Sequence, residues 1–274
     1  MTVDVTESLA AVEEGSPLVN AVTNNVTVND VAQVILHWGG LPVMSDDERE
    51  VPDMVATAQA CLLNMGTVSE EGEATMLTAG EAANEHGVPL VVDPVGVGGT
   101  PTRDRVAERL ASELDTDVIK GNYGEISALA GDDAEVRGVE SVGEYSDIAA
   151  TAVACAQQYD TTVVASGEKD VVATDEAAYE VTAGHPQMGT VVGTGCMLGA
   201  SVATFAGAID DTERAALAGT VAFGLAGEAA AAEEFGEVHG PSSYNVAFKD
   251  AVAGLRETEY DPADERIETV LSAE

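Results

Sequence analysis

Short apolar runs that alternate with longer helical patterns constrain the fold of this 274-residue chain more than any other feature. Five short apolar runs are bounded by turn residues, as expected of strands buried on both faces: residues 41–44, 60–65, 88–93, 118–120 and 161–165. Helical patterns occupy residues 28–38, 70–86, 102–114, 122–130, 142–158, 195–208, 212–235 and 242–255. This alternation predicts an α/β fold, with a mostly parallel central sheet and helices on both faces.

The remaining patterns predict the edge of the sheet and the domain organisation. Residues 170–174 and 178–182 are expected to form a hairpin that extends the sheet with antiparallel edge strands. No internal repeat or long linker divides residues 1–274, so we expect one domain with an acidic, loosely ordered end after about residue 256. The most apolar stretch, residues 215–232, contains glycines and Glu228, which favours a buried or interface helix over a membrane span.

The charge balance excludes several classes of partner. Asp and Glu number 49 against 11 Lys and Arg, which gives a formal net charge of −38 spread along the whole chain. A surface of this kind repels nucleic acid and anionic membranes. Because molar salt shortens the Debye length to about 3 Å and screens the self-repulsion, the composition favours a high-salt cytoplasm. An ordinary acidic protein without such adaptation is the alternative.

The cysteines and histidines exclude other chemistry. Cys61, Cys155 and Cys196 are odd in number and lack paired spacing, so neither a disulfide framework nor a zinc site is indicated. The first residues lack the basic and apolar regions of a secretory signal, and we expect a cytoplasmic location. The four histidines show no paired metal spacing, and no serine lies in a nucleophile-elbow pattern, which disfavours zinc hydrolysis and catalytic triads.

Polar residues follow three of the predicted strands. In open α/β sheets, ligands bind beyond the carboxyl ends of the strands, where Asp93, Lys120 and Ser166 are placed. Asp93 and Glu125 are two carboxylates that could hold Mg²⁺ through waters beside phosphate oxygens. The alternative is a strand-end Asp that caps a turn and a surface Glu, with Lys120 in a simple ion pair.

The segment Gly193-Thr194-Gly195-Cys196 is more specific. Glycines let backbone N–H groups face inward, and a helix that begins near Gly195 adds the positive end of its dipole, which together predict a site for phosphoryl oxygens. The same helix terminus is expected to favour a thiolate at Cys196 and to lower its pKa, so that the side chain orients or deprotonates a substrate hydroxyl. Alternatively, Cys196 is a small apolar residue packed under the loop. Cys61 and Cys155 lie in apolar runs and are predicted to be inert core thiols.

Seven motifs occur in order between about residues 16 and 250: Thr23-Asn24-Asn25-Val26, Gly40-Leu41-Pro42-Val43-Met44, Leu63-Asn64-Met65-Gly66-Thr67, Asn84-Glu85-His86-Gly87-Val88-Pro89, Asp93-Pro94-Val95-Gly96, Gly121-Asn122 with Glu125, and Gly193-Thr194-Gly195-Cys196. Together they resemble the hydroxyethylthiazole kinase family of the ribokinase-like superfamily.

The resemblance implies transfer of the γ-phosphate of ATP to the alcohol of 4-methyl-5-(2-hydroxyethyl)thiazole, which salvages the thiazole half of thiamine. It implies that Cys196 lies beside the substrate hydroxyl, where relatives in the superfamily place an aspartate base. Met44 and Gly193 are then expected to bind the thiazole. The resemblance also implies a homotrimer that shares its thiazole pockets between subunits.

The nucleotide end of the site follows from the same resemblance. Lys120 and Ser166 fall where the family binds ATP, and Asp93 and Glu125 where it organises Mg²⁺ and phosphate. The chain departs from the family pattern at Lys120, where Arg is expected, and at Val192 and Ser166, where Thr is more usual. A lysine offers one ammonium group, whereas the guanidinium of an arginine can donate two parallel hydrogen bonds. This difference is expected to change how the nucleotide is bound.

Two other functions remain open from sequence. A kinase of the same superfamily that acts on a pyrimidine or sugar alcohol would use a similar anion hole, more often with Asp at position 196. A non-catalytic thiazole or nucleotide sensor would keep the pocket without turnover. The carboxylates Asp93 and Glu125, together with the glycine loop, argue against a sensor.

Overall fold

The central sheet determines where the candidate site residues lie. The computed structural model describes residues 3–131, 136–137, 140–141, 147–257 and 266–272. Within them, nine strands form one sheet in the order β11-β10-β9-β8-β5-β4-β3-β1-β2. These strands are β1 (Leu18–Val22), β2 (Leu41–Val43), β3 (Ala60–Asn64), β4 (Leu90–Asp93), β5 (Val118–Asn122), β8 (Thr162–Ser166), β9 (Asp170–Ala173), β10 (Ala177–Val181) and β11 (Ile267–Ser272). A separate pair, β6 (Val136–Arg137) and β7 (Glu140–Ser141), is antiparallel.

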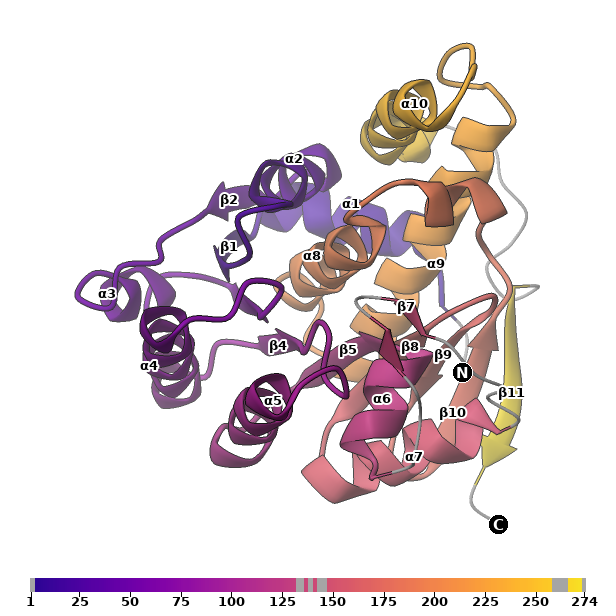
Figure 1. The fold of residues 1–274 in the computed structure, drawn as a ribbon. Coiled ribbons are helices and arrows are strands. Elements are labelled where there is room, and N and C mark those ends of the chain that lie inside the picture. The colour runs from indigo at the N-terminus through magenta and orange to yellow at the C-terminus, as the bar shows by residue number, and fades with distance from the viewer. Residues whose placement is uncertain (1–2, 132–135, 138–139, 142–146, 258–265, 273–274) are drawn as a thin grey trace.

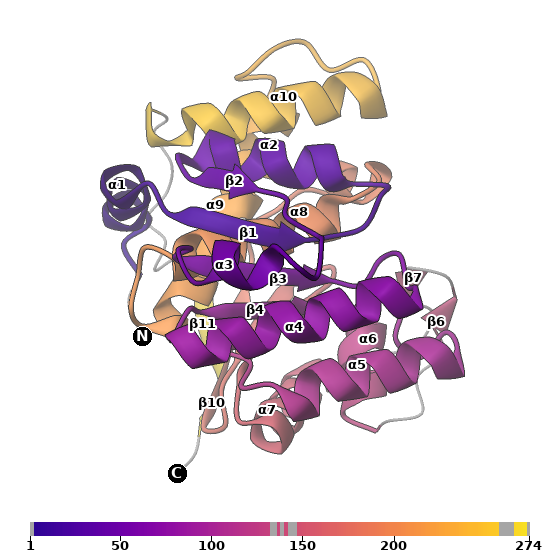
Figure 2. The ribbon, with the colours of Figure 1, turned by 90° about the vertical axis from the view of Figure 1, so that its left-hand side faces the viewer.

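Helices cover both faces of the sheet (Figure 1). One face carries α1 (Val5–Gly15), α2 (Val28–Trp38), α8 (Thr194–Ala206), α9 (Thr212–Ala231) and α10 (Pro241–Gly254). The other carries α3 (Val51–Val55), α4 (Glu70–His86), α5 (Pro101–Glu113), α6 (Tyr123–Leu129) and α7 (Ile148–Tyr159). Two short 3₁₀ helices, η1 (Pro186–Thr190) and η2 (Leu255–Glu257), complete the described elements. Figure 2 shows α4 and α5 side by side across the second face.

The apolar runs predicted as strands are buried on both faces because their side chains alternate between two cores. In β3, Ala60 and Leu62 contribute to the core beneath α2, α8 and α9, whereas Cys61 and Leu63 contribute to the core beneath α4 and α5. Both sets are fully buried. Parallel strands covered by helices on each side require this continuous apolar pattern, so the predicted α/β fold with a mostly parallel sheet is confirmed.

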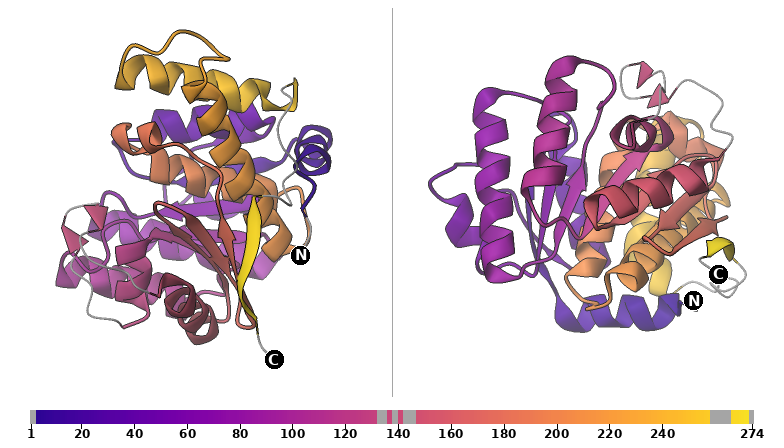
Figure 3. Two further views of the ribbon diagram at one scale, coloured as in Figure 1. Left: turned by 90° about the vertical axis from the view of Figure 1, so that its right-hand side faces the viewer. Right: turned by 90° about the horizontal axis from the view of Figure 1, so that it is seen from below.

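The predicted antiparallel hairpin is present, but it is not the edge of the sheet. β9 pairs antiparallel with β8 and with β10, and β10 pairs in turn with β11, which lies at residues 267–272 within the end expected to be loosely ordered. Figure 3 shows β11 beside β10 at that edge. The helical pattern predicted from residue 142 begins outside the described residues for its first five positions, and α7 starts at Ile148.

Helix α9 explains the most apolar stretch of the sequence. Its residues from Ala215 to Gly227 are buried between the sheet and its neighbours α8 and α10. Among the described residues, no helix has both the length and the apolar character needed to cross a membrane. The stretch is therefore a core helix, as its glycines and Glu228 predict.

Candidate active site

Four parallel strands bring polar residues to one edge of the sheet. Asn64 and Asp93 end β3 and β4 and are register partners, and Asn122 and Ser166 end β5 and β8 and are register partners as well. Since β3, β4, β5 and β8 are consecutive neighbours and run parallel, their carboxyl ends meet at the same edge. The edge is therefore lined by an amide, a carboxylate, a second amide and a hydroxyl.

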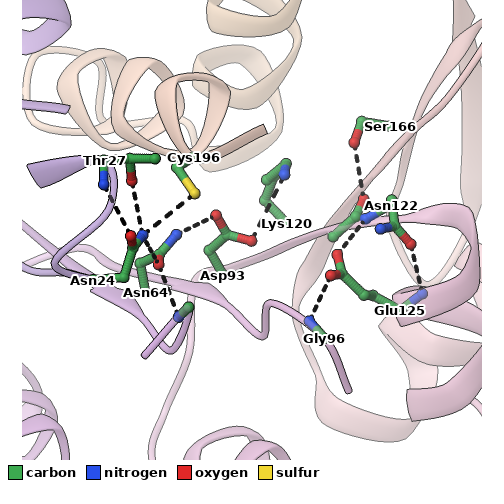
Figure 4. Close-up of polar contacts among 12 residues, drawn as sticks. Asn24, Thr27, Asn64, Asp93, Gly96, Lys120, Asn122, Glu125, Ser166 and Cys196 are labelled. Carbon is green, nitrogen blue, oxygen red and sulfur yellow. Dashed lines mark hydrogen bonds and ion pairs between the residues drawn. The ribbon is translucent and has the colours of Figure 1, made fainter. Parts of the chain in front are cut away.

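A chain of amide hydrogen bonds connects Asp93 to Cys196 (Figure 4). Asn64 donates from Nδ2 to Oδ2 of Asp93 at 2.6 Å, and Asn24 donates from Nδ2 to Oδ1 of Asn64 at 2.8 Å. The same Nδ2 of Asn24 lies 2.8 Å from Oγ1 of Thr27 and 3.5 Å from Sγ of Cys196. The network fixes one oxygen of Asp93 and holds the thiol close to it.

Lys120 supplies the positive charge of the site. Its Nζ lies 3.6 Å from Oδ1 of Asp93, and the two side chains are 3% and 0% exposed. Burial alone would lower the pKa of Lys120, but Asp93 and Glu125 outweigh burial and raise it, so the ammonium stays charged. Burial raises the pKa of Asp93 to about 7, against the opposing influence of Lys120.

The second carboxylate is held by main-chain amides. Asn122 and Glu125 form a capping box at the start of α6, in which the Asn122 N–H donates to Oε2 of Glu125 at 2.7 Å. The Gly96 N–H donates to Oε1 of Glu125, also at 2.7 Å. Burial raises the pKa of Glu125, and the charges of Lys120 and Arg103 oppose that rise. The Glu125 carboxylate thus ties the loop after β4 to the end of β5.

The amino end of α8 lies directly against this charged group. Gly193 precedes the helix with φ of +92°, a left-handed conformation that favours glycine. A Cβ at Gly195 would lie 3.0 Å from Nζ of Lys120, so a larger residue would crowd the ammonium. The first amides of a helix have no partner within the helix and carry its positive dipole end. The predicted anion hole is therefore next to a buried cation.

The thiol of Cys196 does not behave as the sequence predicted. The helix terminus was expected to lower its pKa, whereas burial and the carboxylate of Asp93 raise it, with only partial opposition from Lys120. The prediction of a favoured thiolate is wrong because Cys196 is 9% exposed and faces a negative side chain. Cys61 and Cys155 are buried core thiols as predicted, and burial raises the pKa of each to about 12.

A cleft of about 530 Å³ adjoins the amino end of α8. Ser166 and Gly167 line it from the end of β8, Gly195 lines it from α8, and Ala183 to His185 form part of its wall. Ser166 donates from Oγ to the carbonyl of Gly121 at 3.3 Å. A second cleft of about 940 Å³ opens at the opposite end of the strands, beside residues 86–89 and 115–117, and is lined by none of Asp93, Lys120, Glu125 and Cys196.

The structure groups most of the residues predicted from sequence. Asp93, Lys120, Glu125 and Cys196 interact directly or through their charges, and Ser166 lines the adjoining cleft. Met44 follows β2, which β1 and β3 separate from β4.

Two site residues, Asn24 and Asn64, had no role assigned from sequence. The signal that could have identified Asn64 is its position as an uncharged polar residue at the end of the apolar run Ala60-Cys61-Leu62-Leu63. Asn24 makes two further hydrogen bonds, in which its Oδ1 accepts from the N–H groups of Val26 and Thr27 at 2.9 and 3.0 Å.

Among the described residues, no group of three or more His, Cys, Asp or Glu side chains is arranged to hold a metal ion. Asp93 nevertheless has one buried oxygen, Oδ1, with no hydrogen-bond partner among those residues. Nζ of Lys120 lies 3.6 Å from this oxygen, beyond hydrogen-bond distance, so the atom can still take a cation or a bound ligand as a direct partner.

The comparisons with known proteins all indicate the same family. Residues 9–258 match the model of the hydroxyethylthiazole kinase family. A hydroxyethylthiazole kinase of Natronomonas pharaonis is 65% identical over 272 residues, which cover 98% of this chain and 97% of the relative. One from Haloquadratum walsbyi is 63% identical over 247 residues, which cover 90% of this chain and 86% of the relative. The solved structure of a hydroxyethylthiazole kinase protein from Pyrococcus horikoshii is 32% identical, covers 97% of each chain and superposes with a TM-score of 0.84.

Proposed function

Because the chain belongs to the hydroxyethylthiazole kinase family, we propose that it transfers the γ-phosphoryl group of ATP to the hydroxyl of 4-methyl-5-(2-hydroxyethyl)thiazole. The product is the thiazole phosphate used in thiamine salvage. One observation carries the assignment within the site: the amino end of α8 meets buried Lys120 and Asp93 at the carboxyl edge of the sheet. That arrangement combines donors for a phosphoryl group with a carboxylate beside the acceptor.

The phosphoryl group would be stabilised by fixed positive charge. In-line phosphoryl transfer needs little covalent chemistry from the protein, and catalysis comes from positioning and electrostatic stabilisation. The amides after Gly193 and the buried ammonium of Lys120 are already in place, so they need little reorganisation when charge moves to the transferring oxygens. ATP would occupy the cleft that Ser166 and Gly195 line, with its phosphates toward α8.

Mg²⁺ fits this site through a small number of protein ligands. Mg²⁺ keeps several waters and is bound by one or two carboxylates together with substrate phosphates. Asp93 offers the buried Oδ1, which lies 3.6 Å from Nζ of Lys120 and has no hydrogen-bond partner among the described residues. Both oxygens of Glu125 accept main-chain hydrogen bonds and would reach the ion through water. When bound, the ion would neutralise charge on the phosphate oxygens. Asp93 and Glu125 would be held ready for it by Asn64 and by the amides of Gly96 and Asn122.

Cys196 would orient the acceptor hydroxyl. Its raised pKa leaves a neutral thiol near pH 7, which can donate or accept a hydrogen bond but is a weak base. Gly193 and Met44 are the further candidates for contact with the thiazole. Asn24 and Asn64 keep the thiol within reach of Asp93, so the hydroxyl would lie between a sulfur and a carboxylate oxygen.

The role of Cys196 predicts a specific loss in a Cys196→Ala variant. We expect kcat to fall by roughly 10²-fold, the lower end of what a positioned proton-transfer group contributes, because the hydroxyl loses its partner. The KM for ATP should change little. Steady-state kinetics with each substrate varied checks this, and Cys155→Ala, which removes a buried thiol away from the site, is the matched control. A Cys196→Ala enzyme with wild-type kcat would remove Cys196 from the mechanism.

The assembly and the environment belong to the same proposal. We take the protein to be a homotrimer in the cytoplasm, with the thiazole pocket shared between neighbouring subunits. Support comes from aliphatic side chains exposed on and beside α2, β2 and α10, namely Val28, Leu36, Leu41 and Val246 at 37% to 59% exposure. A surface with a formal charge of −38 also suits a cytoplasm of high salt.

The activity is tested by incubating the protein with ATP, Mg²⁺ and hydroxyethylthiazole and identifying the product by phosphorus NMR and mass spectrometry. The reaction is run in about 2 M KCl and in dilute buffer, because salt at that concentration screens surface repulsion within a few ångströms. We expect the thiazole phosphate in high salt and less or none in dilute buffer. Folded protein that gives no product in either condition, or that prefers a pyrimidine or sugar alcohol, would contradict the proposed function.

A further inference from the structure

Arg103 binds main-chain carbonyls from two loops of the candidate site. It lies on α5, and its NH1 donates to the carbonyl of Met65 at 2.9 Å and to that of Val95. Its NH2 donates to the carbonyl of Gly66 at 3.0 Å. Met65 and Gly66 follow β3, and Val95 follows β4, so one planar guanidinium joins two loops that the sequence separates by about thirty residues.

The use of Arg103 differs from that of its neighbours on the same helix. Arg105 pairs with both oxygens of Glu73 on α4 at 2.7 and 2.8 Å. Arg109 pairs with the same Glu73 and, within α5, with Glu113. The pairs to Glu73 join α5 to α4 on the outer layer, whereas the Arg109–Glu113 pair lies within α5. In a chain with 11 Lys and Arg residues against 49 acidic ones, a guanidinium directed to neutral carbonyls is an unusual use of charge.

The two loops joined by Arg103 carry the groups that hold the carboxylates. Asn64, which donates to Asp93, directly precedes Met65. Gly96, which donates to Glu125, directly follows Val95. Gly96 has φ of +78°, and a Cβ there would lie 3.1 Å from Cδ of Arg103, so the side chain of Arg103 lies close against the backbone of this glycine.

We propose that Arg103 is a positioning residue that sets the placement of Asp93 relative to Glu125. Its hydrogen bonds hold the loop after β3 against the loop after β4 and thereby fix the Asn64 and Gly96 donors. The consequence for catalysis rests on the proposed function, whereas the consequence for loop order does not. Loss of the guanidinium would let the two carboxylates move apart without removing any group that contacts substrate.

The test compares Arg103→Ala and Arg103→Lys with Arg105→Ala, which loses an outer-layer ion pair from the same helix. Hydrogen exchange followed by mass spectrometry reports on peptides that contain residues 64–67 and 93–100, in the full-length protein in about 2 M KCl. Arg103→Ala should exchange faster in both peptides. Arg105→Ala should match wild type in both, and Arg103→Lys should lie between.

The kinetic arm uses the same three variants. For Arg103→Ala we expect kcat to fall by roughly 10- to 100-fold, the usual effect of removing a group that orients ligands from the outer shell. Both KM values should change by less than about threefold, because groups that bind the substrates remain. Millimolar guanidinium ion should restore part of kcat in Arg103→Ala and none in Arg105→Ala.

The two arms separate the possible failures. Wild-type exchange in both loops of a folded Arg103→Ala variant would overturn the positioning role, whatever its activity. Faster exchange with unchanged kcat would overturn the link between loop order and catalysis. A wild-type enzyme without kinase activity would overturn the proposed function, and exchange would still decide whether Arg103 holds the loops together.

Discussion

Replacing Lys120 by Met should lower the free energy of unfolding by about 3–5 kcal/mol, the usual result of removing one partner from a buried ion pair. Asp93 and Glu125 would remain buried without the ammonium, which is 3% exposed in the native protein and 3.6 Å from Asp93. Activity should fall by more than roughly 10²-fold, since a fixed charge directed at the transferring group is lost. Urea unfolding in about 2 M KCl and initial-rate kinetics measure the two effects.

The same variant should have a stability that depends on pH in a defined direction. Burial already raises the pKa of Asp93 from 3.8 to about 7, and without Lys120 this pKa should rise further. A carboxyl group with a higher pKa in the folded state binds its proton more tightly there, so the folded state loses stability as pH rises above the unfolded value. The deficit of Lys120→Met relative to wild type should therefore be larger near pH 8 than near pH 5, by the linkage relation.

Lys120→Arg is the matched variant because it keeps the charge and introduces the residue that the family pattern leads us to expect. We expect it to fold and to retain activity within about tenfold. The largest change should be in the KM for ATP, because a guanidinium can donate two parallel hydrogen bonds where the ammonium is a point charge. A deficit in Lys120→Met that is the same at both pH values, or a Lys120→Arg variant as unstable as Lys120→Met, would contradict the electrostatic explanation.

In the central sheet, the sequence predicts the strands formed by short apolar runs and the β9–β10 hairpin, and it misses β1 and β11. β1 contains Asn20, which is fully buried and exchanges two hydrogen bonds with the main chain of Ser45. A polar residue satisfied by a partner 25 positions away breaks the apolar run, and only the tertiary fold supplies that partner. β11 is missed for another reason: most of its side chains are exposed, and its order comes from pairing with β10.

Within the site, the positions of several residues could be predicted from sequence, but the direction of the pKa shift of Cys196 could not. Strand ends and a glycine-rich helix start place Asp93, Lys120 and Gly193 by general rules of α/β sheets. The pKa of Cys196 depends on burial and on Asp93, which joins the site from a strand about a hundred residues earlier, so a local argument from the helix dipole gave the wrong direction. The contacts of Arg103 could not be predicted from sequence either, because its hydrogen-bond partners are main-chain carbonyls, which every residue type carries.

Gly193→Ala is the second change for which we expect a large effect. Residue 193 has φ of +92°, a conformation that costs a residue with a Cβ roughly 1–2 kcal/mol. The added Cβ would also lie 2.5 Å from Cγ2 of Thr27, a distance that forces movement. Because Thr27 contacts Asn24 and Gly193 is the N-cap of α8, both the amide chain and the anion hole should shift. We expect kcat to fall by roughly 10²- to 10³-fold, as when an oxyanion donor is lost.

A second substitution separates the clash from the backbone conformation. Thr27→Ser removes Cγ2 and keeps the hydroxyl that contacts Asn24, so Gly193→Ala/Thr27→Ser should recover the part of the activity that the clash removes. The part that remains lost reports the cost of the left-handed conformation and the displaced amides. Gly240→Ala is the control, because residue 240 has open space around it and an extended backbone. If Gly193→Ala were as active as Gly240→Ala, the amino end of α8 could not be the phosphoryl site, since its first amides would have moved without consequence.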